Sequence, residues 1–262
     1  MLLFLTTMPT FILMILGVGI SVLVAIAGVY AARRFVPSEL LKDHNDVAGN
    51  IYNMLGVVYA VLLAFVVFVV WQQYQNVGQA VDNEANAVIT LYRVAQALPD
   101  PTRTQLMADL RAYTQGVVND EWQHLGRYEE GPLPETALSR LWATGTAFQP
   151  RTMQESDLYT QVLSRIQDVT RLRRERFQAD HTRIPVVLWV LLLGGGFIIV
   201  VFTFFFGTRN GHIHALMTAA LAAVIAFTLV LIFVLDHPFA GSVRIGPEPF
   251  RTALLLFQSA GK

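Results

Sequence analysis

Residues 50–98 read NIYNMLGVVYAVLLAFVVFVVWQQYQNVGQAVDNEANAVITLYRVAQAL, and most of the apolar or small side chains recur in alternating steps of three and four. That spacing keeps the recurring residues on a single helix face. No proline interrupts the segment before Pro99. One helix of this length measures on the order of 70 Å, whereas a hydrocarbon core is about 30 Å thick. We therefore expect this helix to cross a membrane and to continue into a polar domain as a stalk.

Charged residues are absent from four long stretches of the chain. Residues 1–32, 47–81, 184–208 and 210–235 contain no Lys, Arg, Asp or Glu, while residues 72–183 hold 26 of the 38 charged residues. Each stretch exceeds the roughly 20 apolar residues that a membrane-spanning helix needs. The sequence therefore predicts an all-α polytopic membrane protein with four transmembrane helices and a helical extramembrane domain between the second and the third.

These stretches divide the chain into four expected segments. They are a first transmembrane hairpin (1–75), a helical polar domain with the stalk extension of the second span (76–183), a second transmembrane hairpin (184–236) and a C-terminal tail (237–262). Beyond the stalk, the polar domain shows a helical period without strand alternation. The pattern predicts helices over about 102–125, 134–147 and 153–183.

Composition excludes several classes of function. The formal net charge is zero, so no overall basic field favours nucleic acid. Cysteine is absent, which excludes disulfides, thiolate metal sites and thiol catalysis. The chain shows no Gly-rich phosphate loop, nucleophile elbow or metalloprotease helix motif. We therefore expect no enzymatic activity, no cofactor and no bound metal.

Glycines and other small residues recur within the spans and predict close helix contacts in lipid. In the first span they form the stripe Gly17, Ser21, Ala25, Gly28 and Ala32. The third span contains Gly194, Gly195 and Gly196, which either let a neighbouring group approach closely or form a hinge. Close packing is the favoured interpretation.

Three polar clusters near the span ends have two interpretations each. Residues 43–46 (Asp-His-Asn-Asp) suit a hard cation or form a polar turn that caps the second span. His212 and His214 can bind a transition metal or form the polar tip of the second hairpin. Asp236 and His237 can bind an ion or titrate at the membrane boundary, or simply terminate the fourth span. The second interpretation is the commoner one in each pair.

Glu84 lies on the otherwise apolar face of the stalk. A buried carboxylate requires a partner, and the nearest source is the basic end of the last polar-domain helix, which carries Arg171, Arg173, Arg174, Arg176 and Arg183. The apolar seam from Asn53 to Leu98 is longer than one small domain needs, so we expect several copies to pack along it around an axis. Polar residues on such seams often specify register and oligomeric state. Glu84 is therefore either a structural residue or a regulatory one.

Four motifs carry a resemblance to a known family. They are Asn45-Asp46-Val47-Ala48-Gly49, Tyr59-Ala60-Val61-Leu62-Leu63-Ala64-Phe65, Glu84-Ala85-Asn86 with Leu91-Tyr92-Arg93, and Asp236-His237-Pro238-Phe239-x-Gly241. Together they resemble the four-helix membrane family described as bestrophin-like, over about residues 10–255. The resemblance implies an oligomer of four-helix subunits whose second spans line a central ion pathway.

Bestrophins are anion channels with an aromatic and aliphatic constriction on the second span. The residues of this chain that match it are Val61, Phe65, Phe68 and Val69, with the polar Asn53 and Gln72 towards the two ends. Both phenylalanines can instead face lipid or neighbouring helices. Bestrophins also carry an acidic calcium clasp after the fourth span, and this chain offers only Asp236 and Glu248 there. The resemblance therefore does not extend calcium gating to it.

The function we expect is an oligomeric ion channel, anion-permeable, with Asp236, His237 and Arg93 as candidates for ion binding or gating. The alternative is a non-conducting sensor or scaffold whose helical domain binds a partner. Expected partners are further copies of the chain, the lipid bilayer and the permeating ions, and not nucleic acid.

Arginines near the spans bear on orientation in a bacterial inner membrane. Seven basic residues flank the ends of the spans on the side of the polar domain, and four flank the opposite ends. Because positive charge is enriched on the cytoplasmic side, we expect the polar domain and both termini to be cytoplasmic.

Overall fold

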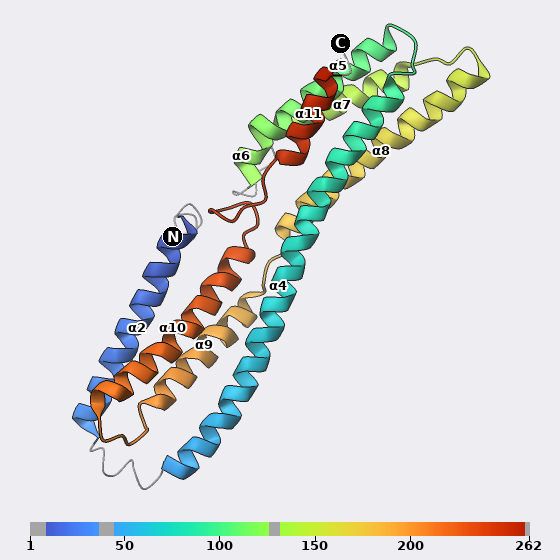
Figure 1. Cartoon of the computed structure of the whole chain (residues 1–262). Coiled ribbons are helices and arrows are strands. Elements are labelled where there is room, and N and C mark those ends of the chain that lie inside the picture. The colour runs from blue at the N-terminus through green and yellow to red at the C-terminus, as the bar shows by residue number, and fades with distance from the viewer. Residues whose placement is uncertain (1–8, 37–44, 126–131, 260–262) are drawn as a thin grey trace. The chain divides into compact units, whose positions relative to one another are not determined.

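A computed structural model describes residues 9–36, 45–125 and 132–259, and all elements within these ranges are helical. Figure 1 labels the main ones along the chain. In order they are α2 (Thr10–Phe35), α4 (Asn45–Ala95), α5 (Thr102–Gly116), the π-helical segment η1 (Val117–Glu121), α6 (Trp122–Leu125), α7 (Pro132–Ala147), α8 (Met153–His181), α9 (Val186–Thr203), α10 (Gly211–Leu235) and α11 (Glu248–Ser259). The expected all-α class is confirmed.

Four of these helices, α2, α4, α9 and α10, are long and apolar enough to cross a membrane. Helix α4 is a single helix of 51 residues, drawn as one unbroken ribbon from light blue to green in Figure 1. The predicted long second helix is therefore confirmed, and it ends at Ala95, four residues before Pro99, which has no N–H to bond the Ala95 carbonyl. Helix α9 begins directly after Pro185, as predicted.

The described residues fall into two compact units, each considered by itself. The membrane unit comprises those within 1–72, 183–236 and 241–243, and the polar unit comprises those within 73–182, 237–240 and 244–262. Helix α4 contributes its first half to the membrane unit and its second half to the polar unit.

In the membrane unit, α10 packs along α2, and small residues make the close approach. A methyl group added at Gly17 would lie 3.0 Å from Val230 of α10, and one added at Gly28 would lie 2.3 Å from the ring of Phe204, which directly follows α9. Ala25, also on the predicted small-residue stripe, is fully buried. The stripe therefore serves helix packing, as expected.

Tyr59 of α4 anchors that helix to α9 in the membrane unit. Its hydroxyl donates to the carbonyl of Leu192 at 2.9 Å. A Cβ at Gly195 or Gly196 would lie 2.8 or 2.7 Å from Tyr59, whereas one at Gly194 would meet nothing within 4 Å. Two of the three glycines therefore make room for a tyrosine, which confirms close packing, and α9 continues through them without a break.

The turn between α9 and α10 is held by residues of the other two spans. The Asn45 side chain donates to the Gly207 carbonyl and accepts from the Gly207 amide, both at 2.9 Å. Arg33 donates to the hydroxyl of Thr208 at 3.1 Å and to its carbonyl at 3.2 Å. Because Asn45 binds backbone in this way, it serves the turn. Residues 43 and 44 of the proposed cation cluster lie outside the described part of the chain.

The core of the polar unit forms around the second half of α4. Val77, Val81, Val88, Leu91 and Ala95 of α4 are all buried in it. They pack in one cluster with residues of α5, α7, α8 and α11, among them Leu106, Leu110, Leu141, Val162, Ile166 and Phe257. This corrects one expectation: the stalk half of the apolar seam is covered by the chain itself, so it is not an interface that specifies register between copies.

Helix α11 was not predicted from the sequence, which left residues 237–262 as a tail. Phe250, Ala253 and Phe257 form its buried face. The ring of Phe257 stacks on Tyr92 with centroids 4.0 Å apart, and its carbonyl accepts from the Tyr92 hydroxyl at 3.1 Å and from Arg111 at 2.7 Å. The end of the chain therefore belongs to the core of the polar unit.

Candidate functional site

One face of α4 is not covered by other parts of the described chain. We call its central stripe the uncovered face, which comprises Asn50, Asn53, Val57, Val61, Ala64, Phe68, Gln72, Gln75, Gln79, Asp82, Asn86, Thr90 and Arg93. These exposed residues follow one another in steps of three and four, so they form one stripe along the helix. Met54, Val58 and Phe65 are exposed beside this stripe. The opposite face carries Tyr59, Val66 and Val70 in the membrane unit and the buried core residues in the polar unit.

In the membrane unit, the uncovered face is apolar in the middle and polar at its ends. Val61 is 66% exposed and Phe68 is 61% exposed, while Asn53 and Gln72 lie towards the two ends. Phe65, 65% exposed, lies at the edge of the face. Val69 follows Phe68 by about 100° of helix rotation and is half-buried, so it lies off this face.

In the polar unit, the uncovered face carries side-chain amides and hydroxyls. Gln75, Gln79 and Asn86 are exposed, and the charged members are Asp82 and Arg93. Beside this face, a polar groove of about 370 Å³ lies between α4 and α8, lined by Asn83, Asn86, Ala87, Thr90, Arg165, Asp168, Arg171, Leu172 and Glu175.

Glu84 lies on the opposite face of α4 and is fully buried. The Nε of Arg176 on α8 donates to Glu84 Oε2 at 2.7 Å, and the hydroxyl of Tyr113 on α5 donates to Oε1 at 2.6 Å. The expected partner at the basic end of the last helix is therefore confirmed. It comes from the same chain.

The pair belongs to a larger buried network. Arg176 also binds Glu121, Arg173 donates to Glu121 at 2.8 Å, and Arg173 further binds the exposed Glu135. Glu84, Glu121 and Arg176 are 0% exposed and Arg173 is 6% exposed. Two carboxylates and two guanidinium groups thus balance in the interior, which limits the cost of burying charge.

Aromatic rings enclose the guanidinium of Arg176. Its central carbon lies 5.0 Å from the ring centroid of Phe177, 5.4 Å from that of Trp122 and 5.9 Å from that of Phe250. Burial by itself lowers the pKa of Arg176, but the carboxylates of Glu84 and Glu121 outweigh it and raise the pKa above its ordinary value. Burial, followed by the charge of Glu84, raises the pKa of the Tyr113 hydroxyl well above its ordinary value.

Glu121 was missed by sequence reasoning. It ends the π-helical segment η1, which follows α5 without a break. Glu121 lies eleven residues after Leu110 and four after Val117, and these spacings place all three on one face in an α-helical period. An acidic residue on that apolar face is the signal that was available.

The two histidines of the second hairpin bind different partners. His212 is exposed and its Nδ1 lies 3.0 Å from the Tyr30 hydroxyl. His214 is buried, with Nε2 2.8 Å from the carbonyl of Thr203, so it is not part of a polar tip. Among the described residues, no three His, Cys, Asp or Glu side chains are grouped to hold a metal.

Asp236 closes the end of α10. Its carboxylate accepts the backbone N–H of Ile184 at 3.0 Å, which ties the start of the α9 segment to the end of α10. Burial raises the pKa of this carboxyl, although the Ile184 N–H and Arg183 favour the charged form. His237 is half-buried, and Gly241 has a φ of 73°, a conformation that favours glycine. Helix termination thus accounts for Asp236 in the described structure.

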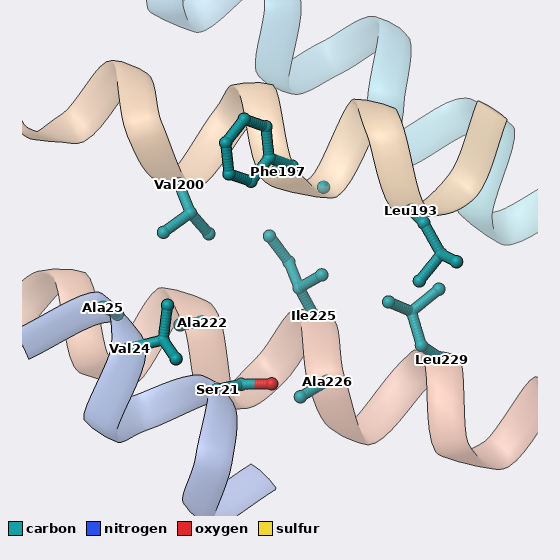
Figure 2. Close-up of a pocket in the computed structure, with 11 residues that line it drawn as sticks. Ser21, Val24, Ala25, Leu193, Phe197, Val200, Ala222, Ile225, Ala226 and Leu229 are labelled. Carbon is teal, nitrogen blue, oxygen red and sulfur yellow. The ribbon is translucent and has the colours of Figure 1, made fainter. Parts of the chain in front are cut away.

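An apolar cavity of about 160 Å³ lies between α2, α9 and α10 in the membrane unit. In Figure 2, Val24, Phe197, Ile225 and Leu229 extend towards it from these helices. Its one hydroxyl, that of Ser21, donates to the Gly17 carbonyl of its own helix at 2.8 Å. The cavity therefore offers no group suited to an ion.

Comparisons with known proteins place the chain by family and fold. A family described as Bestrophin-like domain matches residues 19–250. No curated protein matches the chain.

Solved structures share the fold at low sequence identity. A variant of a bacterial bestrophin homologue from Klebsiella pneumoniae matches with a TM-score of 0.72 and 11% identity, over 94% of this chain and 99% of that chain. A second variant matches with a TM-score of 0.72 and 12% identity, over 95% and 99%. A structure described as a membrane protein matches with a TM-score of 0.71 and 14% identity, over 94% and 97%. At these identities the likeness establishes the fold alone.

Proposed function

The chain belongs to the Bestrophin-like family, and on that premise we propose that it forms a homo-oligomeric, anion-permeable channel lined by the uncovered face of α4. The observation that carries the proposal is the character of this face in the membrane unit. It presents no charged side chain between Asn50 and Gln72, is apolar from Val57 to Phe68, and is polar at its two ends. An ion can be hydrated at either end and meets a narrow apolar passage between them.

Assembly follows from what a single chain leaves uncovered. Val57, Val61, Ala64 and Phe68 are exposed on one side of one helix, together with the polar Asn53. Asparagine is costly to expose to hydrocarbon, so this stripe is better placed around a shared axis than against lipid. The membrane half of α4 is the part left for such contacts between copies, because the stalk half of the opposite seam is covered within the chain.

Conduction through such a passage is controlled by wetting. A constriction lined by valine and phenylalanine excludes water when it is narrow, and the ion then lacks a hydration shell. Smaller side chains at the same positions let water and ions enter. Phe68 lies on the uncovered face and Phe65 at its edge, so Phe68 is the stronger candidate for the constriction.

We further propose a bacterial inner-membrane location, with the polar unit and both termini in the cytoplasm. This orientation is supported by the excess of basic residues near the span ends on the side of the polar unit. The effective excess is smaller than the count from the sequence. Arg173 and Arg176 are held in the buried network, so they contribute less to the excess than freely exposed arginines do. Reporter fusions at each terminus test the orientation independently of conduction.

The decisive experiment is ion flux from purified oligomers in liposomes, with potassium and chloride gradients applied separately. Size analysis in detergent and in lipid nanodiscs comes first, and a monomer in both would refute the assembly. We expect wild-type flux that Phe68→Ala increases. Intact oligomers that pass no ions, as wild type and as Phe68→Ala, across several pH values and voltages, would instead support a non-conducting sensor or scaffold.

A further inference from the structure

The uncovered face of α4 in the polar unit holds two charges of opposite sign. Asp82 and Arg93 are both exposed members of this face. They are eleven residues apart, which is about three helical turns and about 16 Å along the axis. The same face therefore carries a negative charge at one position along the helix axis and a positive charge at another.

Neither charge is neutralised within the described part of the chain. No ion pair involves Asp82 or Arg93 there, although many other charged groups of the polar unit are paired. The exposed side chains of α4 between them, Asn83, Asn86 and Thr90, are uncharged, and Glu84 is buried on the opposite side.

The charges of α8 beside this face cancel one another. In the polar groove, Arg165 pairs with Asp168 at 3.0 Å and Arg171 pairs with Glu175 at 2.7 Å. Two arginines and two acids leave no net charge along this wall. An ion next to α4 therefore experiences mainly the carboxylate of Asp82 and the guanidinium of Arg93.

We propose that Asp82 and Arg93 set the ion selectivity of this protein in opposition, Asp82 favouring cations and Arg93 favouring anions. The inference rests on the proposed function, because it requires the uncovered faces of several copies to surround one axis. Each residue then forms a ring of like charges, and such rings raise the local concentration of the oppositely charged ion. Selectivity would be weak in the wild type, since the two rings act against each other.

The test is the reversal potential of purified channels in a potassium chloride gradient. At about 10 mM salt, where the screening length is about 30 Å, Asp82→Asn should raise the permeability of chloride relative to potassium by about threefold or more. Arg93→Gln should change the ratio by a similar factor in the opposite direction. Both shifts should vanish near 1 M salt, where screening acts within about 3 Å.

Matched variants separate charge from structure. Asp82→Glu and Arg93→Lys keep the charge and should keep the wild-type ratio. Arg174→Gln removes another exposed arginine, on α8 and outside the groove, and should change nothing. Channels that conduct with a selectivity unchanged by Asp82→Asn and Arg93→Gln would overturn this inference alone. Intact oligomers without current would refute the proposed channel and this inference with it.

Discussion

Replacing Glu84 by glutamine removes one of four charges buried together in the polar unit. Glu84, Glu121 and Arg176 are fully buried and Arg173 is nearly so, and the two acids balance the two arginines. Glutamine keeps an oxygen that can accept from the Tyr113 hydroxyl, now 2.6 Å from Glu84. It leaves one unbalanced positive charge in the interior.

Breaking a buried pair from one side costs about 3–5 kcal/mol. Arg176 retains its contact with Glu121, so we expect the lower end, about 3 kcal/mol, for Glu84→Gln. Arg176→Met removes a partner from both acids and should cost more. The double variant should cost less than the sum of the two, because the residues share one network.

Thermal unfolding of the purified protein, followed by tryptophan fluorescence, measures these differences. The fluorescence of Trp122 monitors the buried network, since its ring lies 5.4 Å from the guanidinium of Arg176. Glu175→Gln is the matched control, because Glu175 pairs with Arg171 in solvent at 46% exposure, and exposed pairs contribute about 0–1 kcal/mol. Equal stability of Glu84→Gln and Glu175→Gln would refute the role given to the network.

Three further predictions concern packing and gating. Gly195→Ala should lower the free energy of unfolding by about 1–3 kcal/mol, because the new Cβ would lie 2.8 Å from the Tyr59 ring. Gly194→Ala should leave the stability unchanged, and equal melting temperatures of the two variants would contradict the packing role of Gly195. Phe68→Ala should raise conductance in bilayers without lowering the melting temperature, since Phe68 is 61% exposed within a single copy of the chain. Lower yield and stability with unchanged conductance would show that Phe68 lies in a packed interface. Phe257→Ala should cost about 3–5 kcal/mol and Leu255→Ala little, because Phe257 is 1% and Leu255 65% exposed; a similar loss of stability in both would show that α11 is not docked as described.

The membrane spans were predictable because charge-free stretches and hydrocarbon thickness limit the alternatives severely. The absence of proline between residues 50 and 98 likewise fixed the length of α4. The partner of Glu84 could be predicted because an acidic residue on an apolar seam needs a nearby base, and Arg176 supplied it.

The periodicity of α4 indicated an apolar face. It did not distinguish whether other helices of the same chain or other copies cover that face. The seam was assigned to contacts between copies, whereas the second half of α4 buries it against α5, α7, α8 and α11 of the same chain. Helix α11 itself was overlooked, although Phe250, Ala253 and Phe257 are spaced as one helix face. Glu121 was overlooked although its spacing from Leu110 and Val117 places it on the buried face, and the burial of His214 was missed because this residue lies beside an exposed hairpin turn.

The central claim is that the uncovered face of α4 lines the ion pathway, and single cysteines test it most directly. The chain contains no cysteine, so one introduced thiol is the sole target of a charged methanethiosulfonate reagent. In conducting oligomers, modification of Val61→Cys or Gln72→Cys should block current, because both positions lie on the uncovered face. Val66→Cys and Val70→Cys, on the buried face of the same helix, should be unaffected. Block at the buried positions with none at the uncovered ones would contradict the assignment of the pore.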